Sequence, residues 1–264
     1  MTSSSLRTVA ANVYLTALRE GGSVPAVVQA DDGRPYVVKF RGAAQGVRVL
    51  LAELVAGELA RAFGLPVPEL VLADVSADLG RAEPHPEIRA QLLASAGRNL
   101  GMAFLSGALG YEVAAKTNVS TELASRIVVF DAFVSNVDRT ARNPNLLWWQ
   151  GDLWMIDQGA AFYWQYNWAG SIDGAASPFA LIRDHVLLPR AGDLVAAGEE
   201  LRRTMTRDLI EHVLALVPED WLLDPPSLQA PGERRARFAE YLVARRDATS
   251  VFVEEAVRAH AARA

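Results

Sequence analysis

Short apolar runs separated by polar turns fill the first forty positions of the chain. The runs cover residues 9–18, 25–30 and 36–40, and glycine-containing turns at residues 20–23 and 31–35 divide them. Runs of this length between such turns are typical of antiparallel strands joined by hairpins. The pattern therefore predicts a β-meander at the start of the chain.

A helical period follows the meander. Between residues 47 and 63 the leucines, valines and alanines recur three and four positions apart, and Gly64 follows as a C-terminal glycine. Further along, residues 71–75 and 102–105 are strand-like, and residues 86–96 predict a helix. The first hundred residues thus predict a sheet with one principal helix.

The remainder of the chain predicts helices and one hairpin. Ser120 or Thr121 is a candidate N-cap for a helix that ends before Asn136, and Thr206 is one for residues 207–216. One or two amphipathic helices are predicted over residues 232–264. Two apolar runs, residues 146–149 and 153–156, flank a Gln-Gly-Asp turn and predict a β-hairpin.

Together these elements predict an α+β, bilobal protein. We expect a mainly β N-terminal lobe over residues 1–105 and a mainly helical C-terminal lobe over residues 106–264.

Composition and charge exclude several classes of function. A net charge of −5 and a pI near 5.5 argue against a nucleic-acid surface. No apolar run reaches the roughly 18 residues of a membrane span, and residues 1–5 lack a signal-peptide core. The absence of cysteine excludes disulfides and thiolate chemistry, and four scattered histidines give no zinc or Ser-His-Asp pattern. We expect a cytoplasmic protein.

Lysine is rare, because only Lys39 and Lys116 among the 26 basic residues are lysines. Lys39 closes the third predicted strand, and two explanations fit it. It is either a solvated strand-end charge or a compact ammonium that contacts a phosphate. Glu53, in the following helix, is a candidate partner that would hold the ammonium, and Glu58 is the alternative.

The turn between the first two strands contains Gly21, Gly22 and Ser23. Glycine lets backbone amides approach a ligand closely, so this turn is a candidate phosphate-binding loop. Taken alone, it is more typical of an ordinary hairpin loop, because such loops are common.

Oxygen-bearing side chains gather at both ends of the predicted hairpin. Asp138 and Asn143 precede it, and Asp157 follows it. A hairpin brings its ends together, so we expect Asn143 and Asp157 to be neighbours and to offer the oxygen ligands that Mg²⁺ takes. Asp138 is placed to accept or orient the proton of an attacking hydroxyl, and Arg139 and Arg142 could neutralise phosphate charge.

Each residue of this group also has a structural explanation, because loops use Asp and Asn to satisfy their own backbones. The order of the whole set is more specific than any member. A glycine turn, a strand lysine, a helix glutamate, an Asp with an Asn five positions later and an Asp-x-Gly are the working parts of phosphoryl transfer.

At these positions the chain resembles the HipA-like kinases, which share the protein-kinase-like fold with the phosphatidylinositol kinases. The resemblance lies in YVVKF (36–40), AELVAGELARAFGLPVPE (52–69), NVDRTARNPNL (136–146) and LWMIDQGAAF (153–162). It implies that Lys39 contacts the phosphates of ATP and that Glu53 steadies Lys39.

The resemblance also implies roles in the second half of the site. Asp138 would be the catalytic aspartate, Asn143 and Asp157 would bind Mg²⁺, and Phe104 and Leu105 would form the hinge that meets adenine. The sequence thus predicts an ATP- and Mg²⁺-dependent kinase acting on a hydroxyl, with protein Ser or Thr, Ser23 included, as the expected acceptor. A kinase acting on a small molecule or lipid headgroup and a non-catalytic nucleotide-binding scaffold are the alternatives.

Overall fold

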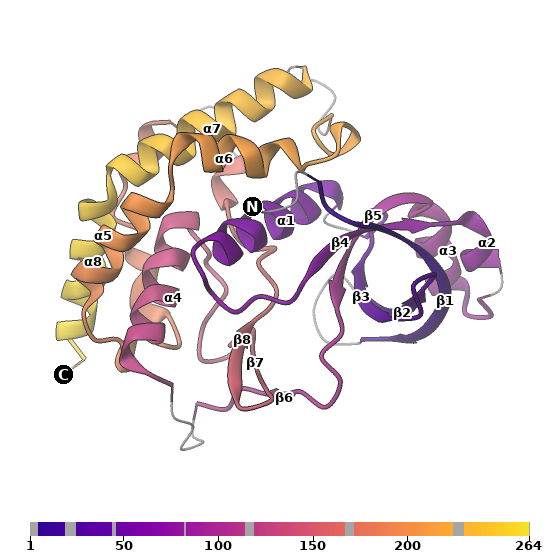
Figure 1. Cartoon of the computed structure of the whole chain (residues 1–264), viewed down its shortest axis with the longest axis horizontal. Helices are drawn as coiled ribbons and strands as arrows, with labels where there is room; N and C mark the ends of the chain where they lie inside the picture. Colours follow the sequence, from indigo (N-terminus) through magenta and orange to yellow (C-terminus); the bar gives the residue numbers. More distant parts are fainter. Residues whose placement is uncertain are drawn as a thin grey trace.

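The structure is a computed structural model that describes residues 5–18, 25–43, 46–81, 83–113, 119–166, 172–223 and 230–263. Within these ranges the chain forms two lobes, a barrel of strands and a group of packed helices (Figure 1). The predicted α+β, bilobal architecture is confirmed.

The N-terminal lobe is a closed five-stranded barrel. Its strands are β1 (Thr8–Ala17), β2 (Ala26–Ala30), β3 (Pro35–Lys39), β4 (Leu70–Val75) and β5 (Gly97–Ala103). The order around the barrel is β1-β2-β3-β5-β4, and the pairing of β1 with β4 is parallel whereas the others are antiparallel. The predicted meander is therefore present as three sides of a barrel.

Strand β5 begins at Gly97 and not at residue 102, where the sequence pattern placed its start. Its first residues are polar or glycine and carry no strand pattern of their own. They are extended because β5 lies between β3 and β4 and pairs with both. Backbone pairing on two sides outweighs the weak local preference.

Helix α1 (Gly46–Ala62) connects β3 to β4 and lies between the barrel and the helical lobe (Figure 1). It is buried on most of its circumference, as expected for a helix enclosed on all sides. Gly64 ends it in the left-handed conformation, with φ of 74°, and so confirms the predicted glycine stop. Two further helices, α2 (Ala77–Arg81) and α3 (Pro86–Ala94), precede β5.

The C-terminal lobe begins with a three-stranded sheet. It contains β6 (Leu109–Gly110), β7 (Leu146–Trp149) and β8 (Asp152–Met155), paired in that order. The β7–β8 hairpin is closed by Gln150 and Gly151, which both have positive φ, 52° and 89°. Two central residues with positive φ are the signature of a type I′ turn, whose twist matches the flanking strands.

Helices form the rest of this lobe. They are α4 (Thr121–Val134), α5 (Leu194–Thr204), α6 (Arg207–Ala215), α7 (Pro231–Asp247) and α8 (Thr249–Ala261), with 3₁₀ turns η1 (Tyr163–Tyr166), η3 (Asp173–Ala176), η4 (Ala180–Asp184), η5 (Leu188–Arg190) and η6 (Glu219–Trp221). The predicted caps are confirmed, because Ser120 accepts a hydrogen bond from the Leu123 N–H and Thr206 accepts one from the Leu209 N–H.

The apolar interior consists of two clusters. One fills the barrel, and the other runs from α1 through α4 to α8. Helix α1 belongs to the second cluster, whereas the strands before and after it, β3 and β4, contribute to the barrel cluster. The helix therefore lies at the junction of the two lobes.

None of the helices in the described ranges has the length and hydropathy needed to cross a bilayer.

Candidate active site

A cavity of about 1320 Å³ lies between the two lobes. Of the predicted site residues, Lys39, Phe104, Leu105, Asp138, Asn143 and Asp157 line it. The predicted glycine turn, Gly21, Gly22 and Ser23, lies outside the described residues. Leu18 and Pro25, which flank that turn, line the cavity.

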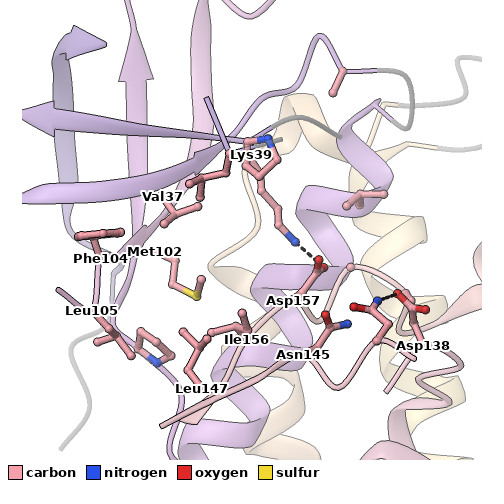
Figure 2. A pocket seen from close by; sticks show the side chains of 18 of the residues that line it. Val37, Lys39, Met102, Phe104, Leu105, Asp138, Asn145, Leu147, Ile156 and Asp157 are labelled. Carbon is pink, nitrogen blue, oxygen red and sulfur yellow. Dashed lines mark hydrogen bonds and ion pairs between the residues drawn. The ribbon is translucent and has the colours of Figure 1, made fainter. Parts of the chain in front are cut away.

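Lys39 is bound by two carboxylates at the centre of the cavity wall. Its Nζ lies 2.7 Å from Oε2 of Glu53. The same Nζ lies 2.6 Å from Oδ1 of Asp157 (Figure 2). Glu58, the alternative partner from sequence, instead lies 3.5 Å from Arg61. Of the two candidate glutamates, Glu53 is therefore the partner of Lys39. Glu53 is 14 positions from Lys39 in the chain, and Asp157 is 118 positions from it.

The three charged groups differ in their access to the cavity. The side chains of Lys39 and Glu53 are 9% and 3% exposed, whereas that of Asp157 is 43% exposed. A ligand can therefore reach the Asp157 carboxylate without displacing the buried pair of Lys39 and Glu53.

Interactions within the cluster keep Lys39 and the exposed Asp157 charged. Burial acts to lower the pKa of Lys39, but the two carboxylates outweigh it and hold that pKa above its usual value. Burial acts to raise the pKa of Asp157. The Lys39 ammonium and the Gly159 N–H outweigh burial and keep that pKa below its usual range. Burial raises the pKa of Glu53, against the pull of Lys39. Asp157 thus presents a carboxylate at neutral pH.

Local backbone geometry fixes the position of Asp157. The residue lies two positions after the end of β8 and has φ of 53°, in the left-handed region. Gly159 follows in a place where a Cβ atom would lie 2.8 Å from Cγ1 of Val49 on α1. Only glycine lets this segment pack so closely against the helix that carries Glu53.

Asp138 lies in the loop after α4 and faces the cavity from the C-terminal lobe (Figure 2). Its backbone N–H donates to Oδ1 of Asn136 at 3.1 Å, so Asn136 forms the Asx-turn that sequence offered as the structural explanation. The Asp138 carboxylate has a different role, since it accepts a hydrogen bond from Nδ2 of Asn143 at 2.7 Å.

Asn143 and Asp157, which the sequence predicts to be neighbours, both line the cavity, but Asn143 lies outside the paired part of the hairpin. The residue opposite Ile156 is Asn145, whose carbonyl accepts the Ile156 N–H at 3.0 Å. Asn143 lies earlier, in a turn closed by hydrogen bonds with the Thr140 backbone. Both amides line the same cavity as Asp157.

The predicted hinge residues border the apolar end of the cavity. Phe104 and Leu105 follow β5 and lie near Met102, Leu147 and Ile156 (Figure 2). The Phe104 N–H donates to Pro35, and the Leu105 carbonyl accepts from Ala108. The Phe104 carbonyl and the Leu105 N–H make no hydrogen bond to the part of the backbone that the structure describes.

Arg139 does not face the cavity, which corrects its predicted role in neutralising phosphate. Its side chain is fully buried and forms an ion pair with Asp131 of α4 at 2.6 Å. It also donates to Oε1 of Gln158 at 2.7 Å and to the Asn145 carbonyl at 2.5 Å. Arg139 therefore ties the loop of Asp138 to the segment of Asp157 from behind.

His185 completes this buried network. Its Nε2 lies 2.9 Å from Oδ2 of Asp131, and its Nδ1 accepts the Leu187 N–H at 3.1 Å. Because Nδ1 is an acceptor, the proton of the neutral ring is on Nε2 and is donated to Asp131. Burial lowers the pKa of His185, and although burial acts to raise that of Asp131, Arg139 and His185 hold it low.

We expect the melting temperature of the protein to fall as the pH drops from 7 to 5. A histidine whose folded pKa lies below its unfolded value of about 6.5 takes up a proton on unfolding, so stability is lost below that pH. The low pKa of Asp131 also makes stability fall as the pH is lowered, but at more acidic pH. Calorimetry of wild type and His185→Gln measures this, because glutamine donates to Asp131 without titrating. An equal pH dependence in both proteins would contradict the assignment.

Sequence reasoning missed Asp131, His185 and Asn145. Asp131 carried a usable signal, because it is a single charge inside the apolar run of α4 and such a charge needs a partner. Asn145, the residue before β7, carried no comparable signal. Nothing in the sequence pointed to His185, whose partner Asp131 is 54 positions away.

The oxygen-bearing groups fit a cation that also binds substrate phosphates. Within the described ranges no three Asp, Glu, His or Cys side chains gather to hold a metal by themselves. One exposed carboxylate with neighbouring amides suits Mg²⁺, which keeps several waters and takes few protein ligands when phosphates supply the others.

The two lobes and the cavity between them are those of a kinase fold. The chain resembles the crystal structure of the Helicobacter pylori proinflammatory kinase CtkA, with a TM-score of 0.53 and 12% identity over 96% of this chain and 97% of that one. The Golgi casein kinase with Mn and ADP bound gives a TM-score of 0.47 and 13% identity, over 96% of this chain and 74% of that one. No significant match was found among curated proteins.

A family model then makes the identification more specific. The model of the HipA-like kinases matches residues 13–254, and the chain belongs to that family. The resemblance inferred from sequence and the predicted kinase-like fold are both confirmed.

Proposed function

We propose that the protein is an ATP- and Mg²⁺-dependent phosphotransferase that phosphorylates a hydroxyl group, with Ser or Thr of a protein as the acceptor. The observation that carries the proposal is the Lys39 ammonium held between Glu53 and an Asp157 carboxylate that is open to the cavity. Membership of a kinase family supports the same chemistry.

The apolar end of the cavity suits adenine. Met102, Leu147 and Ile156 offer apolar contacts, and the Phe104 carbonyl and the Leu105 N–H, which make no hydrogen bond to the described backbone, form an acceptor and donor pair. Adenine presents the complementary pair along one edge, an amino donor beside a ring-nitrogen acceptor. Phosphates attached to a nucleotide bound there would extend toward Lys39.

At the opposite end, charge and position account for catalysis. Asp157 and the loop amide of Asn143 would hold Mg²⁺, which when bound would supply positive charge near the phosphate oxygens. Lys39 adds a fixed positive charge that Glu53 holds in place. Asp138 orients the acceptor hydroxyl and takes its proton as the hydroxyl oxygen bonds to the γ-phosphorus and the bond to the β-phosphate oxygen breaks.

The test is a thermal shift with ATP and Mg²⁺ followed by mass spectrometry. At a nucleotide concentration 100-fold above Kd we expect about 2.7 kcal/mol of stabilisation, or roughly 5–10 °C in Tm. We also expect ADP and a phosphorylated Ser or Thr, on the chain itself or on an added protein. A thermal shift without any phosphorylated product would indicate a non-catalytic scaffold. A phosphorylated small molecule without phosphorylated protein would show that the acceptor is a small molecule and not a protein Ser or Thr.

A further inference from the structure

In the part of the chain that the structure describes, exposed aromatic side chains occur only in the cavity between the lobes. They are Phe104, Tyr163 and Tyr166, and all of them line that cavity. Phe104 belongs to the apolar end, which the proposed function assigns to adenine. The two tyrosines, 48% and 52% exposed, have no role in that assignment. Because tyrosine is enriched where proteins bind partners, the pair indicates a second binding surface in the same cavity.

Both tyrosines lie on one face of the 3₁₀ turn η1. Residues three positions apart in a 3₁₀ helix lie one above the other, so Tyr163 and Tyr166 project from the same side. The two residues between them are buried. The Trp164 ring stacks on Tyr241 of α7 with centroids 4.0 Å apart, and Nε2 of Gln165 donates to a backbone carbonyl of α1 at 3.4 Å. The buried face therefore anchors the turn while the other face meets the cavity.

The backbone that leads into η1 is strained. Phe162 has φ of 56°, in the left-handed region that bulky residues rarely adopt. Its ring is fully buried and makes an edge contact with Phe238, with centroids 6.0 Å apart. Strain of this kind persists only where the surrounding structure enforces it, and it is typical of segments that position functional groups. Here it sets the direction in which Tyr163 leaves the preceding segment.

The turn lies beside the loop that carries Asp138. The Phe162 N–H, directly before η1, donates to the Val134 carbonyl at the end of α4, and Asp138 follows shortly after that helix. Val137, the neighbour of Asp138, is 36% exposed and also lines the cavity. Figure 2 shows Asp138 on the side of Asp157 that faces away from the apolar end. The groups next to an acceptor hydroxyl at Asp138 would therefore meet η1 and Val137.

The chemistry of this surface favours an apolar contact. The guanidinium carbon of Arg48 lies 5.4 Å from the centre of the Tyr166 ring, a cation–π contact that fixes the ring from α1. The two tyrosine rings and the Val137 side chain present mainly apolar area, with phenol hydroxyls at the ring edges. Such a surface suits a large apolar side chain that is flanked by polar peptide groups.

We propose that Tyr163 and Tyr166 form the acceptor-binding surface and contact a large apolar side chain next to the Ser or Thr that is phosphorylated. This inference rests on the proposed function, since it names the protein segment that the same site would accept. Tyrosine suits this role because its ring is rigid and loses little conformational entropy when a partner covers it.

The test uses the whole chain and short peptides with one fixed Ser or Thr, in which each flanking position carries leucine, phenylalanine, lysine or aspartate in turn. Incorporation of labelled phosphate from ATP and Mg²⁺ gives the preference at each position. At one position beside the acceptor we expect leucine and phenylalanine to exceed lysine and aspartate about fivefold or more, the factor typical of one well-packed interface contact.

Tyr163→Ala and Tyr166→Ala each remove one ring. We expect either change to raise KM for the preferred peptide about tenfold, with kcat and KM for ATP unchanged, because the lost contact binds the acceptor and not the nucleotide. Tyr163→Phe and Tyr166→Phe keep the rings and should stay within roughly twofold of wild type. Leu181→Ala, at an exposed residue of η4 outside the cavity lining, is the matched control. An unchanged thermal shift with ATP and Mg²⁺ verifies that each variant is folded.

Three results would contradict the inference and leave the proposed function standing. They are a preference for lysine or aspartate, no preference at any position, and an unchanged peptide KM in both alanine variants. A wild-type protein that phosphorylates no peptide of the set would also overturn the inference. If that protein also phosphorylated neither itself nor an added protein, the proposed protein acceptor would fall with it.

Discussion

Replacing Asp157 with Asn is expected to lower the rate of phosphoryl transfer about 10²–10³-fold while the fold stays intact. The loss corresponds to roughly 3–4 kcal/mol of transition-state stabilisation, within the several kcal/mol that a bound cation supplies. Asparagine has the same shape as aspartate and still accepts a hydrogen bond from Lys39 or the Gly159 N–H. It lacks the charge that attracts the cation.

The melting temperature should change little in this variant. Lys39 keeps Glu53 as a partner at 2.7 Å, so no buried charge is left alone. Initial rates of product formation, measured beside calorimetry, check both expectations. Asp152→Asn, an exposed change in the same hairpin, is the control and should match wild type. A rate for Asp157→Asn within threefold of wild type would sink the assignment of Asp157 to the cation.

Replacing Asp138 with Asn is expected to reduce kcat about 10²–10⁴-fold, the range for removal of a general base. Asp138 touches neither Lys39 nor Asp157 in any hydrogen bond or ion pair among the described residues, so the variant should bind nucleotide normally. This combination of lost turnover with retained binding separates Asp138 from the residues that hold the nucleotide and cation.

Single-turnover rates and the thermal shift with ATP and Mg²⁺ measure the two effects of this variant. The same Asp152→Asn protein serves as the control. If Asp138→Asn lowered the thermal shift as much as it lowered kcat, the carboxylate would belong to the binding of the cation and not to the acceptor hydroxyl.

The Asp157 prediction depends on the different exposure of the two carboxylates that contact Lys39. Glu53 and Asp157 share one ammonium, yet only Asp157 is open to the cavity. Glu53 is enclosed because α1 is packed between the lobes, and its pKa is raised by that burial. Lys39 is therefore anchored from the closed side and remains able to contact a ligand on the open side.

Local elements were predictable because their causes lie within a few residues. The caps at Ser120 and Thr206, the stop at Gly64 and the turn at Gln150 and Gly151 each depend on one side chain or one φ angle. Strand β5 was predicted only in part, because its first residues are extended through pairing with β3 and β4.

The candidate site was predictable as a set of residue types but not as a set of contacts. The order of Lys39, Glu53, Asp138 and Asp157 along the chain indicated phosphoryl transfer. This order can be read directly from the sequence. Two features depended on distances between segments far apart in the chain. They are the choice of Glu53 over Glu58 and the burial of Arg139.

The sequence by itself determined the kinase-like family, the two-lobed α+β fold and the groups available for chemistry. Periodicity, turn residues and the order of the motifs can be read along the chain without knowledge of contacts between distant segments. Only the tertiary structure decided which of those groups meet. Packing of α1 against both lobes joined Lys39 to Glu53 and Asp157, and the buried Arg139 tied the Asn145 carbonyl to Gln158 behind the site. Such contacts span up to 118 positions and follow from burial of a shared core, which no local pattern encodes.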